Sequence, residues 1–142
     1  RLVKILCDHE RFLAEHGVKI VFESDFPPLL VQHFIGKFNP DNFGINYDIG
    51  NSASLGFNVN DEFRCYGDRI LNVHIKDRVL GGTTVALGHG CADFQSVFFN
   101  LNKYHYCGNY ILQTARETLG KHANALMNYR DMTIKWISEH GP

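Results

Sequence analysis

The chain has 142 residues, of which 44% are hydrophobic and 20% are charged, a composition typical of one folded domain. Its formal net charge of -1 at pH 7 comes without any block of like charges, which argues against binding to nucleic acid or to a membrane surface. No apolar run approaches the roughly 18 residues that a membrane-spanning helix needs. We therefore expect a single domain over residues 1–142.

Helical and extended segments alternate along the chain. Apolar residues recur at helical spacing over residues 2–13, and Gly17 follows as a C-terminal cap. Asp25 and the Pro27–Pro28 pair predict the start of a second helix, and Asp93 is placed to cap a later one. The predicted elements, in chain order, are a helix over 2–13, a strand over 18–24, a helix over 28–38, a strand over 43–51, a short helix over 60–66, a strand over 69–77, a helix from 94 to about 101, a strand over 109–114, and a helix over 122–140 that closes at Gly141-Pro142.

The four predicted strands each have an apolar face and a polar face. A doubly wound parallel sheet would be apolar on both faces, whereas a (β/α)8 barrel of the TIM type provides a polar interior with a site at its mouth. Because a full barrel takes about 250 residues, four βα units form about half of one. The apolar face carries Val18, Ile20, Phe22, Phe43, Ile45, Tyr47, Leu71, Val73, Ile75, Tyr110 and Leu112. The polar face carries Glu23, Asn46, Asp48, Asn72, His74, Asn109 and Gln113.

Four residues of the polar face lie at or near the C-terminal ends of the strands, namely Glu23, Asp48, His74 and Gln113. In a barrel these strand ends form one ring, and active sites lie there. Two carboxylates, an imidazole and an amide oxygen suit a divalent ion such as Mn²⁺ or Mg²⁺, and Zn²⁺ or Co²⁺ also accept such ligands. The alternative is that the four residues only solvate the barrel mouth, and spacing alone does not decide between the two interpretations.

The four cysteines, Cys7, Cys65, Cys91 and Cys107, form no C-x-x-C pair. Their even number permits disulfides, but the scattered spacing favours free thiols in a reducing compartment, so we expect a cytoplasmic protein. The N-terminal sequence has neither a Met nor the organisation of a signal peptide. It reads as the middle of a helix, as expected of a fragment.

Three short elements follow one another along the sequence. They are D-x-G-N from Asp48, H-x-K-D from His74 and G-x-G-x-x-D-F from Gly88, and the stretch YCGNYILQTAR comes after them. With these elements the chain, from about Val18 to Arg116, closely resembles the sugar-phosphate isomerases and epimerases of the xylose isomerase-like TIM-barrel superfamily. The resemblance lies within the C-terminal half of that fold and leaves the substrate open.

The resemblance implies a metal site with a defined set of ligands. In the family, Glu, Asp, His and Glu on the last four strands hold the metal; Glu23, Asp48 and His74 match the first three. The two glutamates also move the proton on either face of an enediolate, and Glu23 is expected to keep that role. Gln113 stands at the fourth position and would share in metal binding and catalysis, but it lacks the charge and the second proton carrier.

Further residues near the same strand ends are candidates for substrate binding. Asn51 takes the place of a substrate-binding histidine of some sugar epimerases, and Lys76 and Arg78 are placed to grip a phosphate or sugar oxygens. A solvated strand end is the alternative for these two cations. His89 stands where the family tends to have an acid, and it either contacts substrate or lies on an exposed loop tip. Asp77 points away from His74 and is expected to tether the loop.

Three functions remain open at this level. The first is a metal-dependent isomerase or epimerase of a small sugar or sugar phosphate, which moves a proton next to a carbonyl. The second is a metal nuclease of the endonuclease IV type, which the net charge of -1 disfavours. The third is a non-catalytic relative that binds a sugar or a metal, which Gln113 keeps open.

The predicted half-barrel would have two unpaired sheet edges. Unpaired edges favour pairing with another chain. Either the rest of a barrel is missing from this chain, or two copies associate into a barrel-like dimer. We therefore predict a homodimer or a larger assembly.

Overall fold

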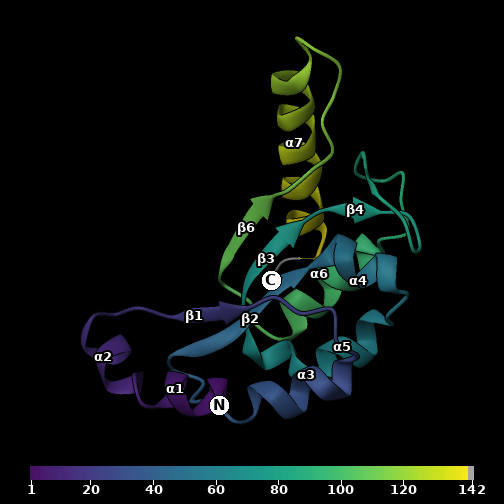
Figure 1. Cartoon of the computed structure of the whole chain (residues 1–142). Coiled ribbons are helices and arrows are strands. Elements are labelled where there is room, and N and C mark those ends of the chain that lie inside the picture. The colour runs from purple at the N-terminus through teal and green to yellow at the C-terminus, as the bar shows by residue number, and fades with distance from the viewer. Residues whose placement is uncertain (141–142) are drawn as a thin grey trace.

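The computed structural model describes residues 1–140 and has the α/β organisation that the sequence predicts (Figure 1). Four parallel strands form one sheet in the order β1-β2-β3-β6, and helices pack on one of its faces. None of the helices in residues 1–140 is both long and apolar enough to cross a membrane. The predicted closure of the last helix at Gly141-Pro142 lies outside the described residues.

Strands and helices alternate in the chain, with one small hairpin after the third strand of the sheet. The strands of the sheet are β1 (Ile20–Phe22), β2 (Phe43–Asp48), β3 (Ile70–Ile75) and β6 (Asn109–Leu112). The hairpin consists of the antiparallel strands β4 (Asp77–Arg78) and β5 (Thr84–Val85). The helices are α1 (Leu2–Cys7), α2 (Glu10–Glu15), α3 (Pro28–Ile35), α4 (Ile49–Leu55), α5 (Val59–Tyr66), the 3-10 turn Gly67–Arg69, α6 (Phe94–Lys103) and α7 (His122–His140).

Two predicted elements differ from the structure in more than the positions of their end residues. The helix expected over 2–13 is two short helices, because the chain turns at Asp8–His9. The strand expected over 43–51 ends at Asp48, and α4, which the sequence did not predict, begins at the next residue. The carboxylate of Asp48 accepts a hydrogen bond from the backbone N–H of Asn51 at 2.7 Å. This N-cap favours a helix over a longer strand.

The predicted start and stop signals of three helices are confirmed. Gly17 follows α2 with a φ of +62°, in the left-handed region that glycine adopts without steric cost. Pro28 is the first residue of α3, where its missing N–H is no loss. Asp93 caps α6 by accepting the backbone N–H of Ser96 at 3.0 Å.

The core lies between the apolar face of the sheet and the helices. Phe43, Val73 and Ile75 are completely buried there, and apolar residues from α3, α5, α6 and α7 belong to the same cluster. Val18 was predicted on this face, but it precedes β1 and is 46% exposed. The central strands β2 and β3 therefore contribute the most deeply buried positions, with the polar side chains on the other face.

A β-bulge corrects the predicted position of Leu71. The register between β2 and β3 shifts after Ile45, and Asn46 pairs with Asn72, so that Leu71 is the extra residue. Its side chain does not join the helix-covered face but occupies the space beside Gly44, on the polar side of the sheet. A side chain at Gly44 would collide with Leu71, which explains the glycine at this position.

The sheet has two open edges, with apolar residues exposed on its outer strands. Within residues 1–140, β1 and β6 each pair with one other strand of the sheet. Val21 of β1 and Ile111 of β6 are 40% and 46% exposed, although both are apolar. These two outer strands therefore have unused backbone groups and uncovered apolar side chains, as expected for a barrel that is half complete.

Candidate metal centre

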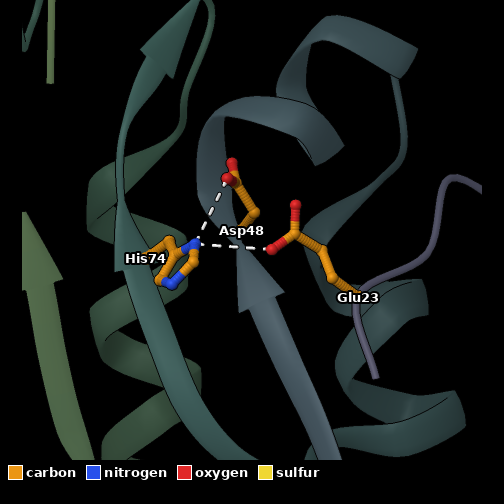
Figure 2. A group of neighbouring side chains, drawn as sticks. All are labelled: Glu23, Asp48 and His74. Atoms are coloured by element: carbon orange, nitrogen blue, oxygen red, sulfur yellow. Dashed lines mark ion pairs between the residues drawn. The ribbon is translucent and has the colours of Figure 1, made fainter. Parts of the chain in front are cut away.

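Glu23, Asp48 and His74 meet at the C-terminal edge of the sheet (Figure 2). Glu23 follows β1, Asp48 is the last residue of β2, and His74 is its direct partner across the parallel ladder. One ligand atom from each residue lies within 4.8 Å of the other two. Because parallel strands end at the same edge, residues that are far apart in the sequence converge here.

The geometry of the three side chains suits a divalent ion. The Nδ1 atom of His74 lies 3.4 Å from Glu23 Oε2 and 3.6 Å from Asp48 Oδ2. The side chain of Asp48 is 1% exposed, that of His74 18% and that of Glu23 40%, so one side of the group is open to a ligand. Two carboxylates and an imidazole at this spacing form a mixed oxygen and nitrogen site, which fits Mn²⁺ or Zn²⁺.

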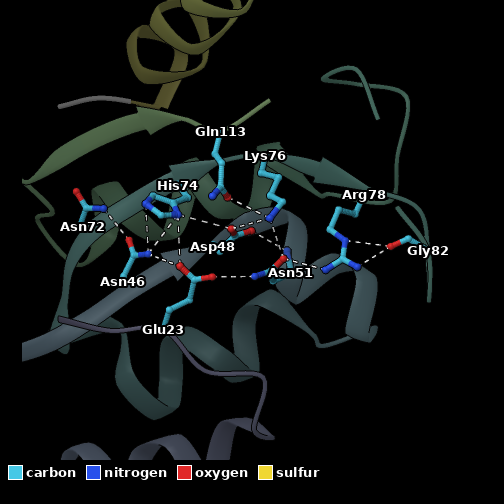
Figure 3. A network of polar contacts seen from close by, with 10 residues as sticks. All are labelled: Glu23, Asn46, Asp48, Asn51, Asn72, His74, Lys76, Arg78, Gly82 and Gln113. Carbon is cyan, nitrogen blue, oxygen red and sulfur yellow. Dashed lines mark hydrogen bonds and ion pairs between the residues drawn. The ribbon is translucent and has the colours of Figure 1, made fainter. Parts of the chain in front are cut away.

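Amide side chains hold the carboxylate of Glu23 in place (Figure 3). Asn46 donates to Glu23 Oε2 at 2.6 Å, and Asn51 donates to Glu23 Oε1 at 2.9 Å. The amide nitrogen of Asn46 also lies 3.2 Å from Nδ1 of His74, and Asn72 donates to the amide oxygen of Asn46 at 2.6 Å. Hydrogen-bond partners of this kind orient metal ligands. Asn51, predicted to bind substrate, thus contacts Glu23 in this structure.

Lys76 and Gln113 occupy the side of the site next to β6. The ammonium group of Lys76 lies 3.3 Å from Asp48 Oδ2 and donates to the amide oxygens of Asn51 and Gln113 at 3.1 and 3.0 Å. Gln113, predicted as the fourth ligand, follows β6 directly, and its backbone N–H donates to the carbonyl of Ile75 at 3.0 Å. The structure thus brings Gln113 to the correct edge, with its side-chain oxygen bonded to Lys76.

Arg78 lies farther along the same edge and is bonded within the protein. Its guanidinium group donates to the amide oxygen of Asn51 at 2.9 Å, and it donates twice to the carbonyl of Gly82 at 3.0 and 2.6 Å. A chain of contacts therefore runs from Glu23 through Asn51 to Arg78 (Figure 3). The edge of the guanidinium group that carries Nε and Nη2 thus holds Gly82 in the loop between β4 and β5.

Asp77 tethers the glycine-rich loop, as the sequence predicts. Its carboxylate, which is 1% exposed, accepts the backbone N–H groups of Gly88, Gly90 and Ala92 at 2.9, 2.8 and 3.1 Å. A side chain at Gly90 would collide with this carboxylate, so the close approach requires glycine. His89 lies exposed between two of the bonded amides, so its backbone is held while its side chain is free to contact a ligand.

A second polar group, which the sequence did not predict, lies behind the end of β2. Glu62 of α5 is 1% exposed and accepts hydrogen bonds from Tyr47 at 2.8 Å, from Tyr66 at 2.7 Å and from Ser52. Burial raises the pKa of the Glu62 carboxyl above its usual value, and the three hydroxyl donors oppose this change. Burial and the neighbouring Glu62 also raise the pKa of Tyr47. A glutamate in a short amphipathic helix gives no sequence signal of such burial.

The amino-acid sequence matches a known family over most of its length. Residues 2–132 match the family described as Xylose isomerase-like TIM barrel. The L-ribulose-5-phosphate 3-epimerase UlaE of Salmonella paratyphi C (strain RKS4594) is 33% identical over 90 residues, which cover 63% of this chain and 32% of that protein. The chain therefore spans about a third of the length of this curated relative.

Solved structures share the fold at lower sequence identity. The xylose isomerase domain protein from Planctomyces limnophilus superposes with a TM-score of 0.82 at 20% identity, over 98% of this chain and 54% of that one. The IolI protein with a binding zinc atom gives a TM-score of 0.75 at 18% identity, over 97% of this chain and 55% of that one. These likenesses confirm the predicted fold, because the chain matches about half of each barrel protein.

Proposed function

This chain belongs to the xylose isomerase-like TIM barrel family, and on that premise we propose that it acts in a divalent-metal-dependent isomerase or epimerase of sugars or sugar phosphates. The observation that carries the proposal is the convergence of Glu23, Asp48 and His74 within 4.8 Å at the C-terminal edge of the sheet. The reaction is a proton transfer on the carbon next to the substrate carbonyl.

Glu23, Asp48 and His74 would hold the ion, with Mn²⁺ or Mg²⁺ as first candidates and Zn²⁺ or Co²⁺ as alternatives. A bound divalent ion supplies stabilisation of the negative charge that develops on the substrate oxygen. The zinc atom named for the IolI structure, which shares the fold, supports the proposal that this chain binds a metal. Gln113 stands at the same edge, where the resemblance expects the fourth ligand, and its amide oxygen accepts a hydrogen bond from Lys76.

Glu23 is the proposed general base. Its carboxylate is 40% exposed, so a substrate carbon can approach it, and hydrogen bonds from Asn46 and Asn51 fix its orientation. Proton transfer by a positioned carboxylate accelerates such reactions by about 10²–10⁴-fold. Gln113 cannot take the proton on the opposite face, so a complete epimerisation needs another carrier there.

Substrate binding is assigned to four polar residues beside the metal ligands. Asn51, Lys76 and Arg78 form one connected row along the edge, and His89 is exposed on the tethered loop. Their cationic and amide groups match the oxygens of a sugar or a phosphate. The name of the relative UlaE, an L-ribulose-5-phosphate 3-epimerase, supports a sugar phosphate.

We place residues 1–142 as one domain that forms the C-terminal half of a barrel. The remaining strands would come from further sequence of a parent chain or from a second copy, which would pair its β1 with β6 of the first. For the 142-residue chain we predict a dimer or a larger assembly. A single monomeric species by multi-angle light scattering would contradict this prediction.

The enzymatic proposal is tested by proton exchange. Wild type and Gln113→Glu are incubated with Mn²⁺ and a panel of ketopentose and ketohexose phosphates in deuterated water, and deuterium entering the carbon next to the carbonyl is followed by NMR. We expect exchange by both, faster with Gln113→Glu, and Glu23→Gln serves as the control without the base. If no substrate exchanges while a sugar phosphate or Mn²⁺ still binds, the non-catalytic alternative replaces the proposal. Cleavage of DNA with abasic sites would favour the nuclease.

A further inference from the structure

The ammonium group of Lys76 sits in a cage of oxygens at the candidate metal centre (Figure 3). The oxygens belong to Asp48 at the end of β2, Asn51 in the first turn of α4, and Gln113 after β6, at 3.3, 3.1 and 3.0 Å. The side chain of Lys76 is 14% exposed and that of Asp48 is 1% exposed. A partly buried cation with three oxygen partners, one of them charged, is a built feature of this site.

Lys76 and the divalent ion need the same oxygen. Oδ2 of Asp48 is the atom that lies 3.6 Å from Nδ1 of His74, on the side of the three ligand atoms. It is also the atom that accepts from Lys76. Two cations on one carboxylate oxygen repel each other, and burial weakens the screening of this repulsion by solvent and salt.

The charges around the site also indicate that Lys76 opposes binding of a divalent ion. Glu23 and Asp48 carry two negative charges, Lys76 returns one positive charge, and Gln113 is neutral. A divalent ion at this site therefore faces less net negative charge than it would in a site whose fourth ligand is a carboxylate. Because the amide oxygen of Gln113 already accepts a hydrogen bond from Lys76, an ion bound to that oxygen would lie beside the ammonium group and be repelled by it.

We propose that Lys76 is a built-in cation that competes with the divalent ion for Asp48, and that Gln113 tethers Lys76 in this position rather than binding the ion. This inference rests on the proposed metal site. In the metal-free protein Lys76 compensates the buried charge of Asp48, and loading of the site weakens the contact between the two. Lys76 thereby sets the metal affinity from inside the site.

Calorimetric titration with Mn²⁺ tests the competition. Lys76→Met is expected to bind Mn²⁺ about tenfold or more tightly than wild type, because the competing charge is gone. Lys19→Met is the matched control, since it removes the same charge from an exposed residue before β1, and its affinity should stay within about twofold of wild type. Equal affinities of Lys76→Met and wild type would overturn the inference.

Gln113→Leu separates a tether from a ligand. If Gln113 tethers Lys76, the leucine variant binds Mn²⁺ as tightly as wild type or more tightly. A loss of about tenfold or more, as expected on removing a direct ligand, would overturn this part of the inference. His74→Ala reports on the proposed function separately: the proposed site stands if wild type binds Mn²⁺ and His74→Ala does not, whatever Lys76→Met does. Absence of Mn²⁺ binding in every variant would remove both proposals.

Thermal unfolding in the presence of a chelator gives a readout without metal. Lys76→Met should lower Tm by about 4 °C or more, because Asp48 is left buried without its cation. Lys19→Met should leave Tm within about 1 °C. A metal-free Tm of Lys76→Met equal to that of wild type would contradict the compensating role. Lys76→Gln repeats both measurements if the methionine variant does not fold, as judged by circular dichroism.

Discussion

Two almost inaccessible carboxylates lie near the end of β2, and they are stabilised in different ways. Asp48 faces the polar side of the sheet, where it contacts the cation of Lys76, the imidazole of His74 and a backbone N–H. Glu62 lies on the helix side and accepts only hydroxyl groups, from two tyrosines and Ser52. A cavity of about 20 Å³ is lined by residues of both groups.

This difference indicates that Asp48 belongs to a binding site, whereas Glu62 is a structural anchor. Three fixed neutral donors bond the carboxylate of Glu62, and these hydrogen bonds link α4, α5 and β2. Asp48 depends on partners that carry or can carry charge, and these lie beside the partly exposed Glu23. Such partners can be exchanged for an ion, whereas exchange of a tyrosine hydroxyl in the core would cost unpaired polar groups. Loss of each carboxylate should therefore have a different consequence.

The largest effect is expected from Glu62→Ala. The change leaves three buried hydroxyl groups without their acceptor and opens a cavity, so the free energy of unfolding should fall by about 3–5 kcal/mol. Denaturation in urea measures it. Glu139→Ala, which removes a surface glutamate paired with Lys135, should cost no more than about 1 kcal/mol. A loss below about 1 kcal/mol for Glu62→Ala would show that the buried group is not an anchor.

Asp48→Asn should have the opposite profile. The asparagine keeps the helix cap but loses the charge, and the affinity for Mn²⁺ should fall about 100-fold, which corresponds to about 2.7 kcal/mol. The free energy of unfolding should fall by only about 1–2 kcal/mol. Calorimetric titration and urea denaturation of the same preparation measure both quantities. Unchanged Mn²⁺ affinity would remove Asp48 from the proposed ligands.

Asp77→Ala tests a third carboxylate, which holds a loop and no ligand. Loss of its three backbone partners should lower the free energy of unfolding by about 2 kcal/mol. Amide hydrogen exchange at Gly88 and Gly90 should become faster, while the metal affinity stays close to that of wild type. Asp41→Ala, at an exposed position, is the control. Unchanged exchange at the two glycines would contradict the tether.

The smallest effect is the pH dependence that Glu62 contributes. Because burial raises its folded-state pKa above the ordinary value of 4.5, the folded state holds this proton more tightly than the unfolded state. The resulting stability is present below about pH 4.5 and is lost as the pH rises through the folded pKa, at about 1.4 kcal/mol for each pH unit that separates the folded and unfolded pKa values. Unfolding free energies of wild type and Glu62→Gln between pH 4 and 8 measure it. The decline with pH should be smaller in the variant, and equal slopes would contradict the assignment.

Local patterns in the sequence predicted a large part of this fold. Alternating faces and helical spacing placed the four strands and most helices, and the caps at Gly17 and Asp93 are as predicted. They did not predict α4. This helix begins where the side chain of Asp48 accepts the backbone N–H of Asn51, and that hydrogen bond is not visible in the pattern of apolar and polar residues. They also misplaced Leu71, because a bulge depends on the register between two strands and not on either strand alone.

The sequence by itself determined that Glu23, Asp48, His74 and Gln113 end neighbouring strands on the polar face, because strand periodicity is a local property. Only the tertiary structure decided which atoms meet. Parallel pairing of β1, β2 and β3 brings the first three together, and the approach of β6 to β3 places Gln113 on the ammonium group of Lys76. The burial of Glu62 among hydroxyl groups likewise follows from packing of α5 against β2 and α4, since two of its three partners, Tyr47 and Ser52, lie in those other elements.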